Sequence, residues 1–183
     1  MVTGSVAAVI GLTAAGGIFA AGPASAADRY DSIHLLNTGK CLDAENDARG
    51  NPWQNGDKVQ LWDCNGSWQQ GWTWHPWPPD PSLSYITNDA SGKCLDAEFD
   101  ANGSPADPGD KVQLWTCGSG GNFAFQQLWT WGHVNGAAKP PGMCNQEAYL
   151  SLDAENDANG HPSQNGDKVQ LWWSTNGANQ QFG

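Results

Sequence analysis

Cys41-Leu42-Asp43-Ala44-Glu45, followed by Val59-Gln60-Leu61-Trp62, decides the fold of this chain because the pair of blocks is written three times. The second copy starts at Cys94 and reaches Val112-Gln113-Leu114-Trp115, and the third starts at Ser151 and reaches Val169-Gln170-Leu171-Trp172. Both blocks move together along the chain, so one unit is repeated in register. We expect repeats at about 30–78, 83–132 and 143–183.

The composition favours an all-β domain. The 183 residues include 11 Trp, 23 Gly and 11 Pro, and the mean hydropathy is −0.54, which is typical of many short strands joined by tight turns. No segment keeps the 3.6-residue apolar period of a long amphipathic helix. The net charge of −11 and the pI near 4.4 argue against nucleic acid and anionic membranes as partners, and leave a neutral or cationic ligand.

Residues 1–26 are predicted to be a secretory signal peptide. They carry no charge, are rich in small and apolar residues, and end in Ala24-Ser25-Ala26, the pattern that a signal peptidase cuts. No Lys or Arg precedes Arg29, so the usual positive start is missing; a membrane anchor is the alternative. We expect a secreted protein whose mature domain, residues 27–183, does not insert into a membrane.

Four of the five cysteines occupy equivalent positions in the first two copies, and both positions become serine together, Ser151 and Ser174, in the third. The joint loss predicts that the two positions touch, because losing one partner alone would leave a stray thiol. Each bridge should contribute ~2–4 kcal/mol by restricting the unfolded chain. Cys144 is left over, either as a buried free thiol or as an intermolecular bridge. The predicted disulfides are Cys41–Cys64 and Cys94–Cys117.

Alternation along each VQLW block predicts a strand with two different faces. Val59 and Leu61 should face one side, and Gln60 and Trp62 the other, as an exposed amide beside an exposed ring. A core Trp is the alternative. A second block, Gln-x-aromatic, closes each copy and should place amide and ring on the same face of a strand, with the three rings in a core near a pseudo-threefold axis. These blocks end at Trp72, Trp129 and Phe182.

In each copy an acidic loop lies between the block that contains Leu-Asp-Ala-Glu and the VQLW block. The pattern D-x-E-x-D followed by Gly resembles the start of a Ca²⁺ loop, although no bidentate Glu stands at the expected distance, and a solvated acidic turn is the alternative. A glycosidase needs two differently tuned carboxyl groups, and three near-identical loops argue against one. The carboxylates concerned are Asp43, Glu45, Asp47, Asp96, Glu98, Asp100, Asp153, Glu155 and Asp157.

Taken in order, Gly39-Lys40-Cys41-Leu42-Asp43, VQLW, Asp63-Cys64-Asn65-Gly66 and Gln-x-Trp make the chain resemble the ricin B-type lectin repeat over about residues 30–183. This repeat also occurs as a carbohydrate-binding module of secreted bacterial glycosidases. The resemblance implies a β-trefoil of twelve strands in three lobes, six forming a barrel and six a cap. It also implies a shallow sugar pocket on each lobe.

Carried over by position, the resemblance assigns to each pocket an Asp that accepts hydrogen bonds from sugar hydroxyls, a stacking Trp and a flanking Gln. The family's Asn directly before Gln-x-Trp is matched only by Asn179, and the acidic loop is longer than usual. The implied carbohydrate-binding residues are Asp43, Gln60, Trp62, Asp96, Gln113, Trp115, Asp153, Gln170, Trp172 and Asn179.

The resulting expectation is a secreted, non-catalytic lectin with up to three pockets for glycans or polysaccharides. It should be a monomer and require no cofactor, with calcium as an option. Three other readings stay open: a Ca²⁺-dependent lectin acting through the acidic loops, a small acidic glycosidase, and a trefoil that binds or inhibits proteins. Trp74 to Pro81 and Gly132 to Met143 are expected to be connectors, the first a rigid surface loop.

Overall fold

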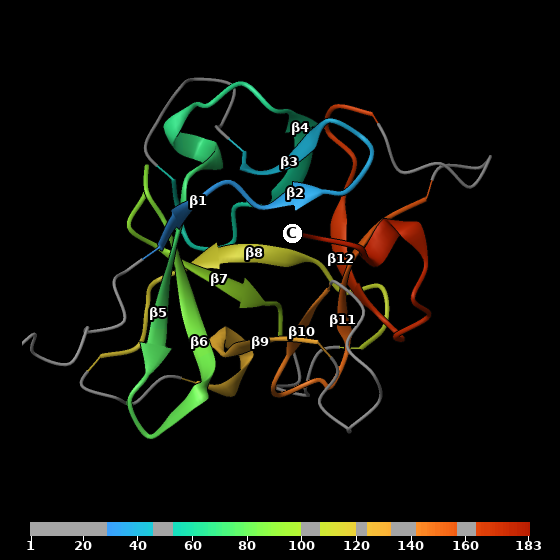
Figure 1. Cartoon of the computed structure of the whole chain (residues 1–183). Coiled ribbons are helices and arrows are strands. Elements are labelled where there is room, and N and C mark those ends of the chain that lie inside the picture. The colour runs from blue at the N-terminus through green and yellow to red at the C-terminus, as the bar shows by residue number, and fades with distance from the viewer. Residues whose placement is uncertain (1–28, 46–52, 100–106, 120–123, 133–141, 157–163) are drawn as a thin grey trace, which may run out of the picture.

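The computed structural model describes residues 29–45, 53–99, 107–119, 124–132, 142–156 and 164–183 (Figure 1). Nearly all of its regular structure is β, as predicted; the described helices are three short 3₁₀ turns. The predicted signal peptide lies outside these residues, and none of the described helices has the length and apolar character to cross a membrane. The elements are β1 Arg29–Asp31, β2 His34–Leu35, β3 Lys40–Ala44, β4 Val59–Asp63, η1 Trp68–Gln70, β5 Trp72–Trp77, β6 Asp80–Asn88, β7 Cys94–Ala97, β8 Val112–Trp115, η2 Phe125–Gln127, β9 Trp129–Trp131, β10 Met143–Asn145, β11 Ser151–Ala154, β12 Val169–Trp172 and η3 Ala178–Gln180.

Three equivalent antiparallel hairpins form the cap: β3–β4, β7–β8 and β11–β12. We call the repeats that contain them lobes one, two and three. Single β-bridges join the hairpins in a ring, because Lys58 pairs with Gln113, Lys111 with Gln170, and Lys168 with Gln60. The cap therefore closes on itself around a pseudo-threefold axis.

Five of the other strands form one continuous part of the larger sheet, and β2 pairs with β3. β1, β5, β6, β9 and β10 pair antiparallel in this order, with β6 and β9 joined through Ser84 and Trp129. The last residues return to β2, where Leu35 pairs with Phe182 and Gly183 exchanges backbone hydrogen bonds with His34, so the C-terminus lies beside β2 in Figure 1. The expected β-trefoil is confirmed.

The core is built from the apolar positions of all three lobes. Val59 and Leu61, and their counterparts in the other two hairpins, are fully buried, as alternation predicts. Trp72, Trp129 and Phe182 are also fully buried, which confirms their place in the core. The two indole N–H groups donate to Leu42 O and Leu95 O, both at 3.0 Å. Burying large rings contributes much of the free energy of folding.

The predicted surface loop after Trp74 is instead a β-hairpin. β5 and β6 pair along their length, with a shift in register between Pro76 and Trp77. Pro76 has no N–H to donate to the ladder, so the irregularity falls where the sequence cannot continue regular pairing. The Trp77 ring packs edge-on against Phe125, with ring centroids 6.3 Å apart.

Both predicted disulfides are present, Cys41–Cys64 and Cys94–Cys117, with Cα atoms 5.1 and 5.0 Å apart. In lobe three the side chains at the equivalent positions, Ser151 and Ser174, hydrogen-bond each other. Cys144 is a buried free thiol whose Sγ lies 3.4 Å from Ser151 Oγ, which confirms the first of the two alternatives.

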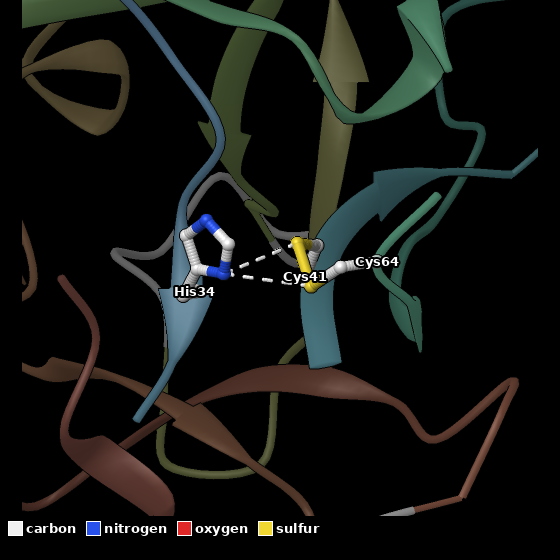
Figure 2. A group of neighbouring side chains, drawn as sticks. All are labelled: His34, Cys41 and Cys64. Carbon is white, nitrogen blue, oxygen red and sulfur yellow. Dashed lines mark hydrogen bonds between the residues drawn. A yellow bond between two sulfur atoms is a disulfide. The ribbon is translucent and has the colours of Figure 1, made fainter. Parts of the chain in front are cut away.

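His34 lies against the first disulfide, which the sequence did not predict. Figure 2 shows its Nδ1 atom facing both sulfurs, at 3.5 Å from each. The ligand atoms of His34, Cys41 and Cys64 lie within 4.8 Å of one another, but both sulfurs are spent in the disulfide, so no thiolate is available to hold a metal. His34 is the strand partner of Cys41. The equivalent residue is Thr87 in lobe two and Cys144 in lobe three.

Candidate functional site

Each lobe buries one aspartate between two glutamines. Asp43 on β3 lies opposite Gln60 on β4; Gln60 Nε2 donates to its Oδ1 at 3.2 Å, and Gln70 Nε2 from η1 donates to its Oδ2 at 3.1 Å. Asp96 accepts in the same way from Gln113 and Gln127, both at 3.0 Å. The repeated sequence thus builds the same carboxylate–amide cluster in each lobe.

The first glutamine of this cluster corrects the sequence interpretation. Gln60, Gln113 and Gln170 are only 5–8% exposed and do not stand beside the tryptophan as exposed amides. Their amide N–H groups are directed at the aspartates across the hairpin, because the strand register places the two side chains opposite each other. They position the carboxylate and present little of themselves to a ligand.

The second glutamine also lies elsewhere than predicted. Gln70, Gln127 and Gln180 each sit at the end of a 3₁₀ turn and do not share a strand face with the following ring. From there Gln70 Oε1 accepts from Asn65 N at 2.9 Å, and its Nε2 donates to Asp63 O at 3.0 Å as well as to Asp43. The amide therefore ties the loop after β4 to the aspartate and satisfies buried backbone groups, as expected.

The tryptophans that end the VQLW blocks face outward. Trp62, Trp115 and Trp172 are 39–41% exposed, whereas buried core tryptophans in this protein are fully covered. Each retains an accessible ring face beside the buried aspartate of its lobe. The prediction that these three rings are exposed is confirmed, and the alternative that they belong to the core is wrong.

Two lobes open these residues into cavities. In lobe three a cavity of about 470 Å³ is lined by Asp153, Gln170, Trp172 and Asn179, among others. In lobe one a cavity of about 360 Å³ is lined by Asp43, Gln60, Trp62 and Gln69, among others. Lobe two carries the same side chains, Asp96, Gln113 and Trp115, on the equivalent hairpin. The structure thus brings the predicted residues of each lobe together.

Each pocket is also bordered by the preceding lobe, which the sequence interpretation missed. A Cβ atom at Gly109 of lobe two would lie 3.6 Å from Trp172, one at Gly56 would lie 4.0 Å from Trp115, and one at Gly166 would lie 4.0 Å from Gln60. All three glycines have positive φ, between 91° and 101°, a conformation that favours glycine. The available signal was the Gly-Asp pair before the Lys-Val-Gln block in every copy.

Asn179 makes lobe three different. Its Nδ2 donates to Asp153 Oδ2 at 2.8 Å, in addition to Gln180 on the same oxygen and Gln170 on the other. A carboxylate offers about four acceptor positions. With two amides Asp43 keeps about two positions for a ligand, and with three amides Asp153 keeps about one. The corresponding residue of lobe one, Gln69, lines the cavity.

Burial raises the pKa of all three aspartates, and the glutamine hydrogen bonds only partly offset it. The shift is large for Asp96, whose pKa rises to about 6. Asp96 is the most completely buried of the three, at 1% exposure. Near neutral pH it is still mostly ionised and can accept hydrogen bonds from a ligand.

The acidic loops are only partly described, because Asp47, Asp100 and Asp157 lie outside the described residues. Among the described carboxylates of these loops, Glu45 forms an ion pair with Lys58 at 3.3 Å and Glu98 with Lys111 at 3.2 Å. Asp43 and Asp96 direct their oxygens at amides. These described side chains do not converge as a preformed set of calcium ligands, and calcium binding stays a prediction.

The fold and the sites define a class: a β-trefoil whose lobes repeat a pocket made of a carboxylate, amides and an indole. A family model described as "Ricin-type beta-trefoil lectin domain" matches residues 29–182. The chain belongs to this family of carbohydrate-binding lectin domains.

Solved structures show the same fold. The designed threefold-symmetric protein ThreeFoil is 23% identical, with a TM-score of 0.64 over 84% of this chain and 95% of that protein. An exo-β-1,3-galactanase from Clostridium thermocellum is 21% identical, with a TM-score of 0.63 over 85% of this chain and 29% of that one. The Rhizoctonia solani agglutinin is 18% identical, with a TM-score of 0.60 over 88% and 96%. The comparison with curated proteins gives no match.

Proposed function

We propose that the protein is a secreted, non-catalytic lectin that binds glycans through the pockets of its lobes. The observation that carries the proposal is the repeated juxtaposition of a buried, hydrogen-bonded aspartate and a tryptophan with an accessible ring face. The apolar C–H face of a pyranose packs on an indole, and the paired hydroxyls of the sugar donate to a carboxylate. Family membership supports the same conclusion.

In lobes one and three the structure describes a cavity of several hundred Å³ beside this pair. Their donor sets differ. Asp43 has room for two sugar hydroxyls, whereas in lobe three Asn179 occupies one of those positions and offers its own amide oxygen. We expect the two lobes to rank sugars differently, and several weak pockets on one chain to give avidity for polymers.

The proposal excludes catalysis because the three carboxylates share one kind of environment. A glycosidase would pair a protonated acid with an ionised partner across the bond to be cut. Here Asp43, Asp96 and Asp153 each accept hydrogen bonds from glutamine amides. Incubation with polysaccharides should release no reducing sugar.

A glycan array, followed by titration with the strongest hit, tests the proposal. Trp172→Ala should remove binding in lobe three and Trp62→Ala binding in lobe one, each without unfolding, since both rings are partly exposed. Trp173→Ala is the matched control, because Trp173 is the exposed neighbour of Trp172 and lies outside the residues that line the cavity. Absence of binding to any glycan on the array would refute the proposal, and loss of binding on adding EDTA would support the calcium variant.

Secretion has its own test. Expression of the full chain in a secreting host should place a protein that begins near Ala27 in the medium, as read by N-terminal sequencing. A protein that keeps residues 1–26 and stays with the cells would contradict the signal-peptide assignment.

A further inference from the structure

A second kind of cavity lies away from the three lobe pockets, along the strand β1. One cavity of about 420 Å³ is lined by Ser67, Trp68 and Asp89, among others, and a second of about 250 Å³ by Trp74, Ser84 and Trp131, among others. Both are also lined by Asp31 and Ser32. Because both linings include these two residues, the cavities adjoin, and we call the pair of them the Trp68 groove.

Aromatic rings stand at both ends of the Trp68 groove. Trp68 is 76% exposed, the highest value among the exposed large apolar side chains of the described residues. At the other end Trp131 stacks on Trp74, with ring centroids 4.9 Å apart and the planes within 23°. The stacking fixes the orientation of both rings before any ligand arrives, which lowers the entropy lost on binding.

Polar groups lie between the two aromatic ends. Asp31 and Asp89 supply carboxylates, and Thr73 Oγ1 donates to Asp89 Oδ1 at 2.8 Å, which holds that side chain in place. Ser67 Oγ is buried without a hydrogen-bond partner among the described residues, although it belongs to the same lining. Because this hydroxyl is covered, the polar groups offered to a ligand here are the two carboxylates.

The combination points to a ligand that is apolar on its faces and rich in hydroxyls at its edges. We propose that the Trp68 groove is a fourth binding site, for an extended saccharide chain without acidic groups. The two cavities in a row suit a chain of several sugar units better than a single one. The two carboxylates and the net charge of −11 repel uronic acids. The carboxylates can also accept hydrogen bonds from hydroxyl or ammonium groups.

The groove is separate from the lobe pockets and is not repeated with them. The position of Trp68 is taken by Phe125 in η2 and by Ala178 in η3. Phe125 packs against Trp77, whereas Trp68 stands in the open. Asp31 and Ser84 are equivalent by register, since they pair with Trp72 and Trp129, yet both contribute to this one groove. It combines residues of lobes one and two with Gly183 of lobe three and is not one of the repeated pockets.

The test uses a variant without lobe binding, Trp62→Ala with Trp115→Ala and Trp172→Ala. Tryptophan fluorescence is titrated with chitohexaose, xylohexaose, a glucosamine hexasaccharide and, as the acidic probe, hexagalacturonate. We expect this variant to bind at least one of the first three and not the fourth. Adding Trp68→Ala should weaken that binding about tenfold, and adding Asp31→Asn should weaken it further.

Controls separate this site from a folding defect and from the lobe pockets. Lobe three shows that the 3₁₀ turn accepts alanine at this position, so Trp68→Ala leaves the fold intact, and Phe125→Ala is the matched control that should leave the titration unchanged. If the lobe variant binds none of the hexasaccharides, or binds them regardless of Trp68, the groove assignment is wrong. Loss of lobe binding in Trp172→Ala or Trp62→Ala is judged separately, in the otherwise unchanged protein.

Discussion

Lobe three has the same strand pairing as lobes one and two, but different bonds stabilise it. Lobes one and two each have a disulfide and an indole N–H bonded to the cap, whereas lobe three has Ser151 bonded to Ser174, and Phe182 in place of the tryptophan. The hairpin register is nevertheless the same in all three lobes. The buried apolar positions and the aspartate–glutamine cluster therefore suffice to form the fold of a lobe. The disulfides and the indole hydrogen bonds add stability.

The contacts between neighbouring lobes, which we call joints, also differ from one pair of lobes to the next. Asn165 of lobe three accepts from Lys40 Nζ at 2.7 Å and from Asp63 N at 2.7 Å in lobe one. Asn55 of lobe one accepts from Lys93 Nζ at 2.8 Å in lobe two. At the third joint Pro108 and Leu150 occupy the equivalent places, and Leu150 is buried in the core. One joint is thus apolar and two are polar.

The largest expected effect is on the disulfides. Replacing Cys94 and Cys117 with serine makes lobe two resemble lobe three, and should lower the free energy of unfolding by about 3 kcal/mol, since the loop closed by the bridge is no longer restricted in the unfolded chain. Urea unfolding measures the loss. The lobe should keep its fold, as judged by amide NMR shifts.

The converse variant strengthens this comparison. Ser151→Cys with Ser174→Cys should form a third bridge and raise stability by a comparable amount, provided that Cys144→Ser is added to prevent mispairing. Unchanged stability of the cysteine-free lobe two would show that the bridges are dispensable.

The pH dependence of stability should single out lobe two. Since the pKa of Asp96 is raised from 3.8 to about 6, the folded protein holds a proton between these values that the unfolded chain has released. Stability from this group is therefore greatest at low pH and falls as the pH rises through the window. We expect the stability of the protein relative to Asp96→Asn to fall by about 2–3 kcal/mol between pH 4 and 7.

Asp43→Asn and Asp153→Asn are the matched controls and should show smaller changes in the same direction, because their pKa values are also raised. Urea unfolding at several pH values measures the difference. A flat difference for Asp96→Asn across this range would contradict the assignment.

A smaller effect is expected from the ring at the core. Trp129→Phe gives lobe two the residue type of Phe182, and removes both ring volume and the hydrogen bond to Leu95 O. The loss should be about 1–2 kcal/mol, measured by thermal and urea unfolding. The exposed Trp173 provides the control, since Trp173→Phe should change stability by less than about 0.5 kcal/mol.

The smallest effect concerns the polar joints. Asn165→Ala and Asn55→Ala should each lower the free energy of unfolding by about 1 kcal/mol, since each removes hydrogen bonds to a backbone N–H and a lysine at a partly exposed site. Unfolding curves of the two variants should nearly coincide. A loss several times larger in one of them would show that the joints are not equivalent.

The repeat made most of the fold predictable. Joint replacement of Cys by Ser in one copy identified the partners of each disulfide, and the alternation of Val59 and Leu61 identified the buried face. Alternation does not say which residue stands opposite in the neighbouring strand. Gln60 faces Asp43 across the hairpin, and this pairing, set by register, turns an apparently exposed amide into a buried one.

The rest of the site depends on contacts between copies, and a pattern read within one copy does not contain them. Gly109 borders the pocket of lobe three although it belongs to lobe two. His34 lies against the Cys41–Cys64 disulfide although histidine occurs at no equivalent position in the other copies. Likewise, Trp68 and Trp131 line two cavities that adjoin at Asp31 and Ser32, far from both in the sequence.

The glycine turns that border neighbouring pockets make ligand recognition a property of pairs of copies. The unit that was duplicated is one copy, but the unit that recognises a ligand straddles two, since the turn of each copy closes against the tryptophan or glutamine of the next. A single copy in isolation would lack the turn that borders its pocket, so each pocket depends on the neighbouring copy being folded beside it.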